Sequence, residues 1–443
     1  MSLKVEIDAR SCNTREGYIE IEGKKLKIPN ILWYSSDRIK APEFAEIKLG
    51  EEIKIGGSFF YPEECKFCIP PSLSYPYFFP SDFPSYFGVN DFFSFVSKNI
   101  CKKEDKIYIM ANSKEVYSNP RDFVEYLTEI RKKIGYKILY APTIANPLNL
   151  AILAYCGIDL FDSIDLIFKS RKKIYFTSEG EINLKGIKEY PCSCIYCRKG
   201  IENFEDLLFH NYEIMKNELV KVRECIKNGN LREYVEAKIH FSTNLASIIR
   251  IMDIEKYSYQ EKRYPVNGKK IIASPYSFYR PDILRFRERI CNIYRKPQSA
   301  KILLLLPCSS KKPYSASKSH KKFIEIISSL KNRNVIHEVI ITSPLAVVPR
   351  ELEYTYPSAH YDISAIGYWD KEEIDIIKKC FEKFIHNNNY DVVINHLSYP
   401  ISSIIEIDAI NTCIDHPTSP SSLKKLSDAL KICENFEYVS KQK

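Results

Sequence analysis

The sequence lacks long apolar runs and is poor in glycine. No stretch approaches the ~18 apolar residues that a membrane helix requires, and the opening MSLKVEIDARSC has no basic segment followed by an apolar one. We therefore expect a cytoplasmic protein without a membrane partner or a secretion signal. Glycine contributes only 14 of 443 residues, which suits a rigid protein or a biased coding composition and decides nothing about function.

The composition is that of a globular protein with several domains. Hydrophobic residues make up 45% of the chain, charged residues 27% and aromatic residues 13%, so the charge excess of a disordered polymer is missing. At roughly 100–200 residues per domain, the length predicts two to four domains. The net charge of +9 is compatible with a polyanionic partner such as nucleic acid but does not require one.

The order of patterns predicts an α/β protein with two main domains. Period-two alternation in the first 60 residues indicates antiparallel strands, and residues 61–95 form a loop region rich in proline and aromatic residues. Apolar runs alternate with helical stretches between residues 105 and 190, which suggests parallel strands in a barrel or an open sheet. We expect domains at 1–270 and 271–443, the second again α/β with parallel strands from the runs KILLLLP, HEVIITSP and YDVVINHLS.

A cysteine cluster predicts a metal site in the first domain, at about residues 190–215. Fourteen cysteines in a long chain without a signal peptide read as reduced thiols, metal ligands or core residues. Cys192, Cys194 and Cys197 follow a C-x-C-x-x-C spacing, and His210 comes thirteen residues later on a predicted helix. Three thiolates and one imidazole can complete the closed shell of a structural zinc. The alternative is a redox or merely buried cluster.

The segment around this cluster resembles a known family. The run YAPTIANPLNLAILAYCGIDLFDS, followed by PCSCIYC and FHN, is similar to archaeal tRNA-guanine transglycosylases over about residues 140–215. The resemblance implies a divergent TIM-type barrel and makes Asp162 the counterpart of the nucleophile that attacks the ribose. A buried or helix-capping aspartate is the alternative. Residues 1–150 contain no Asp-Ser-Gly-Gly-Phe-Gln motif for base recognition, which argues against base exchange.

A second motif follows a strand of the second domain. The sequence PCSSKKPYSASKSH, residues 307–320, places a thiol, lysines, hydroxyls and a histidine on the loop after KILLLL. Ligands bind at this edge of open α/β sheets. Adjacent lysines and a helix N-terminus are expected to lower the pKa of Cys308, so that a thiolate is available to attack an electrophilic carbon. Core packing is the alternative for this cysteine.

The spacing P-C-x-x-x-K-P-Y-x-x-S-x-x-H resembles the signature of the archaeosine synthases, paralogues of the transglycosylases. The likeness extends over about residues 140–430. It implies an enzyme that adds an amine, free lysine in one form and glutamine in an older description, to the nitrile of 7-cyano-7-deazaguanine at position 15 in the D-arm of tRNA. The product is an amidine on the way to archaeosine. A radical-SAM partner is implied for the later cleavage of the lysine carbon skeleton.

The chemistry of nitriles assigns roles to the motif. A nitrile is a poor electrophile, so a site must add a stronger nucleophile or protonate the developing imine nitrogen. We expect Cys308 to attack or orient the nitrile, His320 to shuttle the proton, and Lys312 to hold a phosphate or the donor carboxylate. Further expected substrate contacts are Tyr314, Ser317, Arg350, Glu351, His360 and Asp362, with helix capping as the alternative for Ser317 and burial for His360 and His416.

The route of tRNA binding is open. The relatives commonly end in a basic PUA domain, which we do not expect in this chain because it stops about 25 residues after HPTS. Candidate surfaces are the basic stretches 131–133, 169–173 and 280–289, or a separate RNA-binding subunit. Two other functions remain: a transglycosylase that inserts the deazaguanine base, and a non-catalytic tRNA-binding scaffold for the radical-SAM partner.

Overall fold

The chain forms two compact units in a computed structural model, Met1–Tyr264 and Pro265–Lys443. The structure describes residues 4–21, 24–36, 38–49, 53–55, 58–60, 93–98, 107–266, 268–363, 369–399 and 401–434. Most of the expected aromatic loop lies outside these residues, as do Cys65 and Cys68, a second C-x-x-C of the sequence that we do not assign to a site. In the described part of the chain, no helix is both long enough and apolar enough to cross a bilayer.

The first unit opens with an antiparallel three-stranded sheet, as the alternating pattern predicts. Its strands are β1 (Lys4–Ser11), β2 (Thr14–Ile21) and β3 (Lys24–Ile28). Cys12 and Asn13 form the tight turn between the first two strands, and Cys12 takes a positive φ of 57°.

A mixed sheet of eight strands follows, in the order β7-β6-β5-β4-β11-β10-β9-β8. Every neighbouring pair in the part β5-β4-β11-β10-β9-β8 of this order is parallel, and β11 pairs with the early strand β4. The β7-β6 and β6-β5 pairs are antiparallel. A TIM-type barrel is not confirmed, because among the described residues the sheet has two ends, at β7 and β8. The strands are β4 (Asn30–Tyr34), β5 (Ile47–Leu49), β6 (Ile53–Ile55), β7 (Ser58–Phe60), β8 (Phe93–Val96), β9 (Ile107–Met110), β10 (Leu139–Tyr140) and β11 (Leu160–Asp162).

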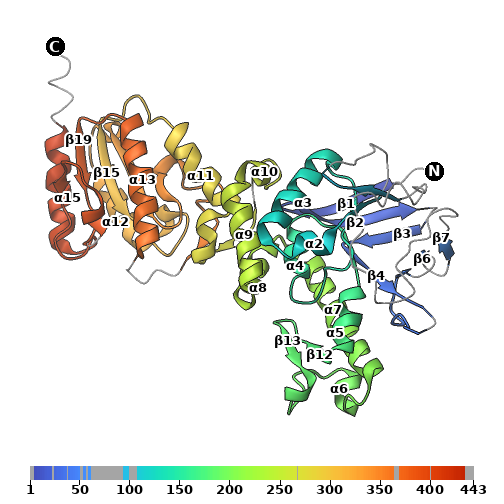
Figure 1. Ribbon diagram of the computed structural model, residues 1–443. Helices are drawn as coiled ribbons and strands as arrows, with labels where there is room; N and C mark the ends of the chain where they lie inside the picture. The colour runs from blue at the N-terminus through green and yellow to red at the C-terminus, as the bar shows by residue number, and fades with distance from the viewer. Residues whose placement is uncertain are drawn as a thin grey trace. The chain divides into compact units, whose positions relative to one another are not determined.

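Helices complete this unit, and Figure 1 shows α6 and the hairpin of β12 (Ile174–Phe176) and β13 (Glu181–Asn183) grouped near one end of α7. The long α7 starts at a capping box of Asn203 and Asp206 and ends at Gly229, whose φ of 67° suits glycine. The helices are α2 (Ser113–Tyr117), α3 (Pro120–Ile134), α4 (Leu150–Tyr155), α5 (Ile164–Arg171), α6 (Ile195–Lys199), α7 (Phe204–Asn228), α8 (Leu231–Lys238), α9 (Thr243–Glu255) and α10 (Tyr257–Glu261).

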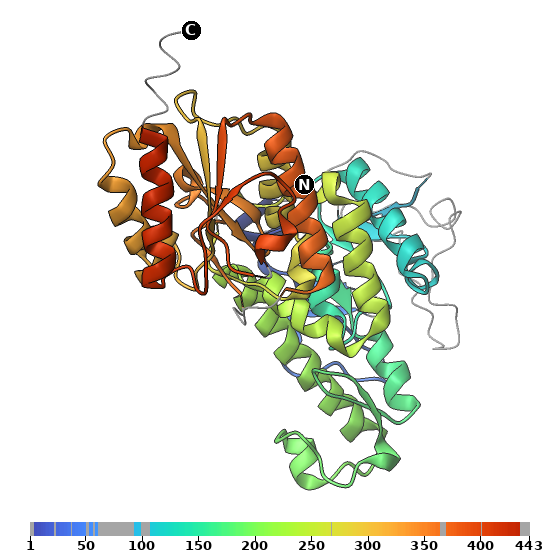
Figure 2. The same ribbon diagram turned by 90° about the vertical axis from the view of Figure 1, so that its left-hand side faces the viewer.

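The second unit is a five-stranded sheet with helices on both faces (Figure 2), in the order β17-β16-β15-β19-β20. Its strands are parallel except β17, and β15 lies in the centre. A small parallel pair, β14 with β18, stands apart from this sheet. The strands are β14 (Ile271–Ile272), β15 (Ile302–Pro307), β16 (Ile336–Thr342), β17 (Ala346–Pro349), β18 (Tyr361–Asp362), β19 (Val392–Asn395) and β20 (Ile410–Asn411).

The leucines of β15 explain why its sheet is covered on both faces. Leu303 and Leu305 belong to one apolar cluster, whereas Leu304 and Leu306 belong to another, since successive side chains of a strand point to opposite faces. The first cluster includes residues of α11 and α13, and the second includes residues of α12 and α15. The helices are α11 (Pro281–Asn292), α12 (Lys318–Ser328), α13 (Lys371–Asn387), α14 (Ile401–Ile404) and α15 (Pro420–Glu434).

A buried ion pair joins helices α8 and α9 of the first unit. The two terminal nitrogens of Arg232 donate to the two carboxylate oxygens of Asp253 at 2.9 and 2.6 Å. Arg232 also donates to Glu236 and to the hydroxyl of Tyr155, both at 2.8 Å. The ion pair is fully enclosed, with Arg232 and Asp253 each 2% exposed.

We predict that Arg232→Met destabilises the first unit by about 3–5 kcal/mol, because it leaves the Asp253 carboxylate buried without its counter-charge. Urea denaturation followed by circular dichroism measures the change. Arg121→Met is the matched control, since Arg121 pairs with Glu255 at the exposed surface and its loss should matter much less. Equal effects of the two substitutions would contradict the prediction.

Candidate functional site

The predicted cysteine and histidine ligands come together in the first unit. Cys192, Cys194 and Cys197 lie just before and within α6, and His210 lies on α7. Their candidate ligand atoms all fall within 4.8 Å of one another. The Nδ1 atom of His210 is 3.2 Å from the Cys197 sulfur and 3.5 Å from the Cys194 sulfur. This arrangement can hold a metal ion and is consistent with a structural zinc site.

Neighbouring groups orient these ligands. His210 donates from Nε2 to the Phe176 carbonyl at 2.9 Å, which leaves Nδ1 facing the sulfurs. The Tyr175 ring stacks on the imidazole at 3.9 Å between centroids, and its hydroxyl lies 3.3 Å from the Cys197 sulfur. Backbone N–H groups of Cys194 and Cys197 each donate to a cluster sulfur at 3.4 Å. Such N–H···S bonds favour thiolates, so the donor set fits a metal.

The second candidate group surrounds Cys308 at the carboxyl end of β15. Cys308 is half-buried and packs against the apolar cluster on the α11 and α13 face. Lys312 places its Nζ atom 4.2 Å from the centroid of the Tyr361 ring. Burial lowers the pKa of Lys312, while the neighbouring Cys308 opposes that shift.

The expected lowering of the Cys308 pKa is wrong. Burial raises the pKa of this thiol, and Lys312 together with a hydrogen bond involving Thr342 only partly opposes the rise. The lysine therefore acts in the predicted direction, but desolvation of the thiolate is the larger effect. At neutral pH the thiol form dominates in the protein without substrate.

A buried chain of hydroxyl groups lies behind the thiol. The Tyr314 hydroxyl is 2.6 Å from that of Tyr361, which in turn is 2.6 Å from the Thr342 hydroxyl. Tyr314 is fully buried, so its side chain supports the loop from the interior and is not accessible to a substrate. Thr342 ends β16, whose Ile341 pairs with Pro307, and this parallel register brings it level with Cys308. The sequence interpretation missed Thr342, although the rule that parallel strands end at one edge could have found it.

His320 is the last residue of the motif but is not placed to shuttle protons. Its ring is fully buried, donates from Nε2 to the Pro307 carbonyl at 2.9 Å, and accepts at Nδ1 from Arg350 at 2.8 Å. Burial, aided by the Arg350 charge, lowers the pKa of His320 to about 3. Ser317 caps α12 by accepting from the His320 N–H at 3.2 Å, which is the capping alternative. His320 therefore holds the loop to the strand.

Arg350 and Glu351 do not share one pocket. Arg350 bonds Glu338 at 2.6 Å and Glu353 at 3.0 Å, whereas Glu351 pairs with His337 at 3.3 Å. Glu338 and His337 are successive residues of β16, so they point to opposite faces of the sheet. Of these two residues, Arg350 is connected to the PCSSKKPYSASKSH loop in the described part of the chain, through His320.

The remaining predicted polar residues differ in their surroundings. Asp362 forms a 2.6 Å ion pair with Lys270, whose hydrogen bond lowers the pKa of the carboxyl, and Lys312 lowers it further. Sequence reasoning missed Lys270, because the β14–β18 pairing that brings it there gives no local signal. His360 keeps a buried Nδ1 without a hydrogen-bond partner among the described residues. His416 is exposed and contacts Thr418 at 3.0 Å.

Asp162 ends β11 in the first unit and is fully buried. One oxygen accepts from the Tyr140 hydroxyl at 2.7 Å and from the Thr143 N–H at 2.8 Å, and the other accepts from the Ile164 N–H at 2.9 Å. Burial raises the pKa of Asp162 to about 6, although these three bonds oppose the shift. This is the geometry of the buried alternative, since the carboxylate is fully enclosed in this conformation.

Two of the expected basic surfaces are partly internal. Arg131, Arg280, Arg285 and Arg287 are each at most 6% exposed. Arg280 pairs with Asp282 at 2.8 Å, and Arg287 donates to the Pro344 carbonyl at 2.8 Å. These side chains hold the fold together, so the stretch 280–289 as a whole is not a surface for RNA.

Two family models match the chain. Residues 96–243 match the queuine tRNA-ribosyltransferase family, and residues 283–430 match a domain of unknown function, DUF5591. A solved structure of AF0587, itself of unknown function, is 26% identical and covers 32% of this chain and 48% of its own, with a TM-score of only 0.25.

Curated relatives match over most of the chain. The archaeosine synthase subunit alpha of Methanosarcina acetivorans is 36% identical over 76% of this chain and 57% of the relative. The archaeosine synthase of Haloferax volcanii is 33% identical over 73% and 56%, so the chain spans little more than half the length of these relatives. The tRNA-guanine(15) transglycosylase of Methanococcus vannielii is 27% identical over 66% and 43%. The motifs, the fold and these similarities place the chain in the archaeosine synthase family.

Proposed function

We propose that this chain is a tRNA-modifying enzyme of archaeosine biosynthesis. In this proposal it adds the side-chain amine of free lysine to the nitrile of 7-cyano-7-deazaguanine at position 15 of tRNA. Similarity to archaeosine synthases over about three quarters of the chain supports the pathway. The single observation that carries the chemistry is the half-buried Cys308 beside Lys312 at the carboxyl edge of a parallel sheet.

The proposed reaction proceeds in two additions. The Cys308 thiol gives up its proton as its sulfur bonds to the nitrile carbon, and the nitrile nitrogen gains a proton, giving a thioimidate. The lysine amine then adds to the same carbon, the carbon–sulfur bond breaks, and Cys308 recovers its proton. The product is an amidine, and no oxidant or reductant is needed. The thioimidate thus replaces one difficult addition of an amine to a nitrile by two easier additions.

Lys312 suits the proton transfer better than His320 does. An acid works best when its pKa approaches the working pH, and burial moves the pKa of Lys312 downward in that direction. Because burial lowers the pKa of His320 to about 3, its ring lacks the second proton of an imidazolium at neutral pH, and its one N–H is bonded to the Pro307 carbonyl. We therefore assign proton donation to the nitrile nitrogen to Lys312, with His320 as a positioning residue through the Pro307 carbonyl.

The other predicted groups fill supporting roles in this proposal. Asp362 and Lys270 offer opposite charges beside Lys312 that suit the α-amino and carboxylate groups of lysine. A transglycosylase reaction would need Asp162 to reach a ribose, and its burial does not favour that. A non-catalytic scaffold would not need the Cys308–Lys312 pair. A radical-SAM enzyme is proposed as the partner that later cleaves the lysine skeleton, and a separate subunit could add RNA contacts.

We also propose that the metal of the Cys192, Cys194, Cys197 and His210 cluster is zinc. A set of three sulfurs and one imidazole is typical of structural zinc, and no position is left open for a substrate. The cluster would fix α6 to α7 and the hairpin through the His210 bond to Phe176.

Incubation of the protein with nitrile-bearing tRNA and isotope-labelled lysine tests the function. We expect nucleoside mass spectrometry to show position 15 heavier by one lysine. Loss or exchange of the base would support the transglycosylase instead, and an unchanged nucleoside would support the scaffold. A transcript with guanine at position 15 is the control and should take up no lysine.

We expect Cys308→Ala to lower amidine formation by about a hundredfold or more, because the nucleophile is lost. Without lysine, the unaltered protein should form a covalent adduct with nitrile-bearing tRNA that mass spectrometry detects. Near-normal turnover by Cys308→Ala would exclude covalent catalysis.

Lys312→Met should slow alkylation of Cys308 by iodoacetamide at pH 8, because the ammonium that lowers the thiol pKa is gone. Cys413→Ala, in the same unit, is the control.

We expect the purified protein to contain one zinc ion per chain and the Cys197→Ser variant to contain none. Inductively coupled plasma mass spectrometry measures the zinc content. Loss of the ion should lower the melting temperature of the first unit by about 4–8 °C, the shift that ~2 kcal/mol produces in a unit of this size. Cys225→Ser is the control on α7 outside the cluster. A zinc-free protein that melts at the same temperature with and without a chelator would disprove the assignment.

A further inference from the structure

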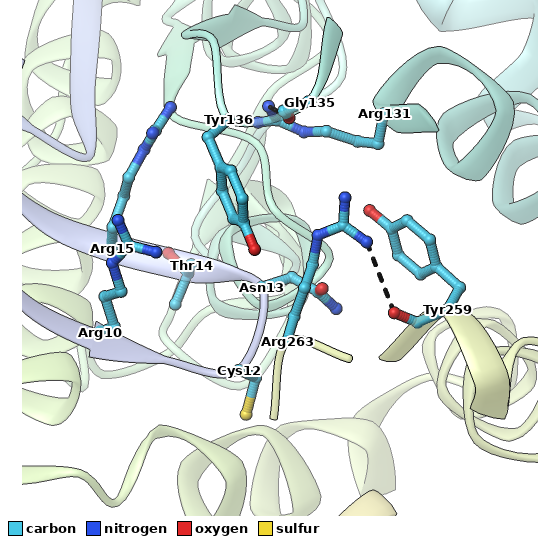
Figure 3. A pocket seen from close by; sticks show the side chains of 10 residues that line it. All are labelled: Arg10, Cys12, Asn13, Thr14, Arg15, Arg131, Gly135, Tyr136, Tyr259 and Arg263. Carbon is cyan, nitrogen blue, oxygen red and sulfur yellow. Dashed lines mark hydrogen bonds between the residues drawn. The ribbon is translucent and has the colours of Figure 1, made fainter. Parts of the chain in front are cut away.

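The first unit contains a pocket that the proposed chemistry does not use. It lies between the β1–β2 turn, the end of α3 and the segment that follows α10 (Figure 3). Arg10, Arg15, Arg131 and Arg263 line it, together with tyrosines and the turn residue Asn13. An arginine is always charged in a protein, so the pocket gathers four permanent cations.

One carboxylate serves two of these arginines. Asp159 accepts from Arg15 at 3.0 Å and from Arg131 at 2.8 Å, and all three side chains are more than nine-tenths buried. Arg10 and Arg263 make no ion pair with any part of the chain that the structure describes. The lining that the structure describes thus holds four guanidinium groups and no carboxylate, and only two of the four pair with Asp159, so the pocket carries a local excess of positive charge.

The hairpin places two of the cations directly opposite each other. Arg10 and Arg15 are cross-strand partners of β1 and β2, and like charges in that relation destabilise a sheet. Tyr136 lies between Arg10 and Arg263, with its ring centre 5.2 and 5.4 Å from their guanidinium carbons. Figure 3 shows this ring at the centre of the group, and its side chain is 57% exposed. Attraction to the ring holds the two unpaired cations in place without neutralising them.

Two of the residues that line the pocket carry buried polar atoms without hydrogen-bond partners in the described part of the chain. Both polar atoms of the Asn13 side chain and the Nε atom of Arg131 are buried and make no hydrogen bond among the described residues. Two of these atoms, Nδ2 of Asn13 and Nε of Arg131, are donors, whereas Oδ1 of Asn13 is an acceptor. A buried polar group left unsatisfied costs about 1–3 kcal/mol, so a ligand that accepts hydrogen bonds would stabilise this arrangement. The needed ligand is an anion with several acceptor oxygens.

We propose that this pocket binds a phosphate group, and that the phosphate is a backbone phosphodiester of the bound tRNA. Guanidinium groups match phosphate oxygens with paired hydrogen bonds, and an aromatic ring at the rim suits a neighbouring nucleotide. The RNA assignment rests on the proposed function, whereas the phosphate assignment does not. The pocket lies beside Asp159, at the start of β11, and Asp162 lies at the other end of that strand. It therefore anchors RNA away from the carboxyl edge of the sheet.

Filter binding of a tRNA transcript at several salt concentrations tests the proposal. Arg10→Gln and Arg263→Gln should each weaken binding about fivefold at 0.15 M salt and reduce the slope of log K against log salt by about one. The transcript needs no modified base, because the pocket contacts the backbone. The result is therefore independent of whether the chain forms an amidine. Arg250→Gln, an exposed position of α9 outside the pocket, is the control and should change neither quantity by as much.

Thermal unfolding in the presence of inorganic phosphate is the second test of the proposal. It should raise the melting temperature of the unaltered protein more than that of the double variant Arg10→Gln/Arg263→Gln. Without phosphate the double variant should be at least as stable as the unaltered protein, because repulsion between cations is relieved. Stabilisation by phosphate with unchanged tRNA affinity would support the phosphate site but assign it to a small phosphorylated ligand. Equal tRNA binding and equal phosphate response in both proteins would overturn the proposal.

Discussion

The second unit depends on burying one apolar strand on both of its faces. The side chains of β15 alternate between two apolar clusters, so the strand can lie only at the centre of a covered sheet. Its carboxyl end then opens directly into the loop that carries Cys308 and Lys312. Because the strand cannot shift without exposing leucines, the position of the thiol relative to Thr342 is fixed by packing rather than by the loop itself.

The sequence could predict the metal-ligand cluster and the strand before Cys308, but not the protonation behaviour of the thiol. The run KILLLLP predicted the strand that the structure shows, and the C-x-C-x-x-C spacing with His210 predicted the ligand cluster that the structure assembles. The pKa of Cys308 was predicted in the wrong direction, because neighbouring lysines are visible in a sequence whereas desolvation depends on distant segments.

The same limit applies to the histidine and the basic stretches. The spacing places His320 one turn into a helix, but only tertiary structure brings in Arg350, which lies thirty residues further along the chain. Arg285 and Arg287 read as surface charge because buried arginines are uncommon, and nothing local announces their carbonyl partners. Arg350 and Glu351, both expected to contact substrate, are separated because their partners Glu338 and His337 point to opposite faces of β16.

Three successive residues of α7 connect the helix to the cysteine cluster, to β12 and to β4. His210 meets the cysteines, Asn211 donates to the Ile174 carbonyl at 3.0 Å, and the Tyr212 ring meets Trp33 of β4 edge to face at 5.2 Å. Further along, Arg223 donates to the Pro29 carbonyl just before β4, at 2.8 Å. The helix α7 is thus held by contacts at several points along its length. If the cysteine loop unfolds locally, for example when the metal is removed, we expect these contacts to keep the eight-stranded sheet folded.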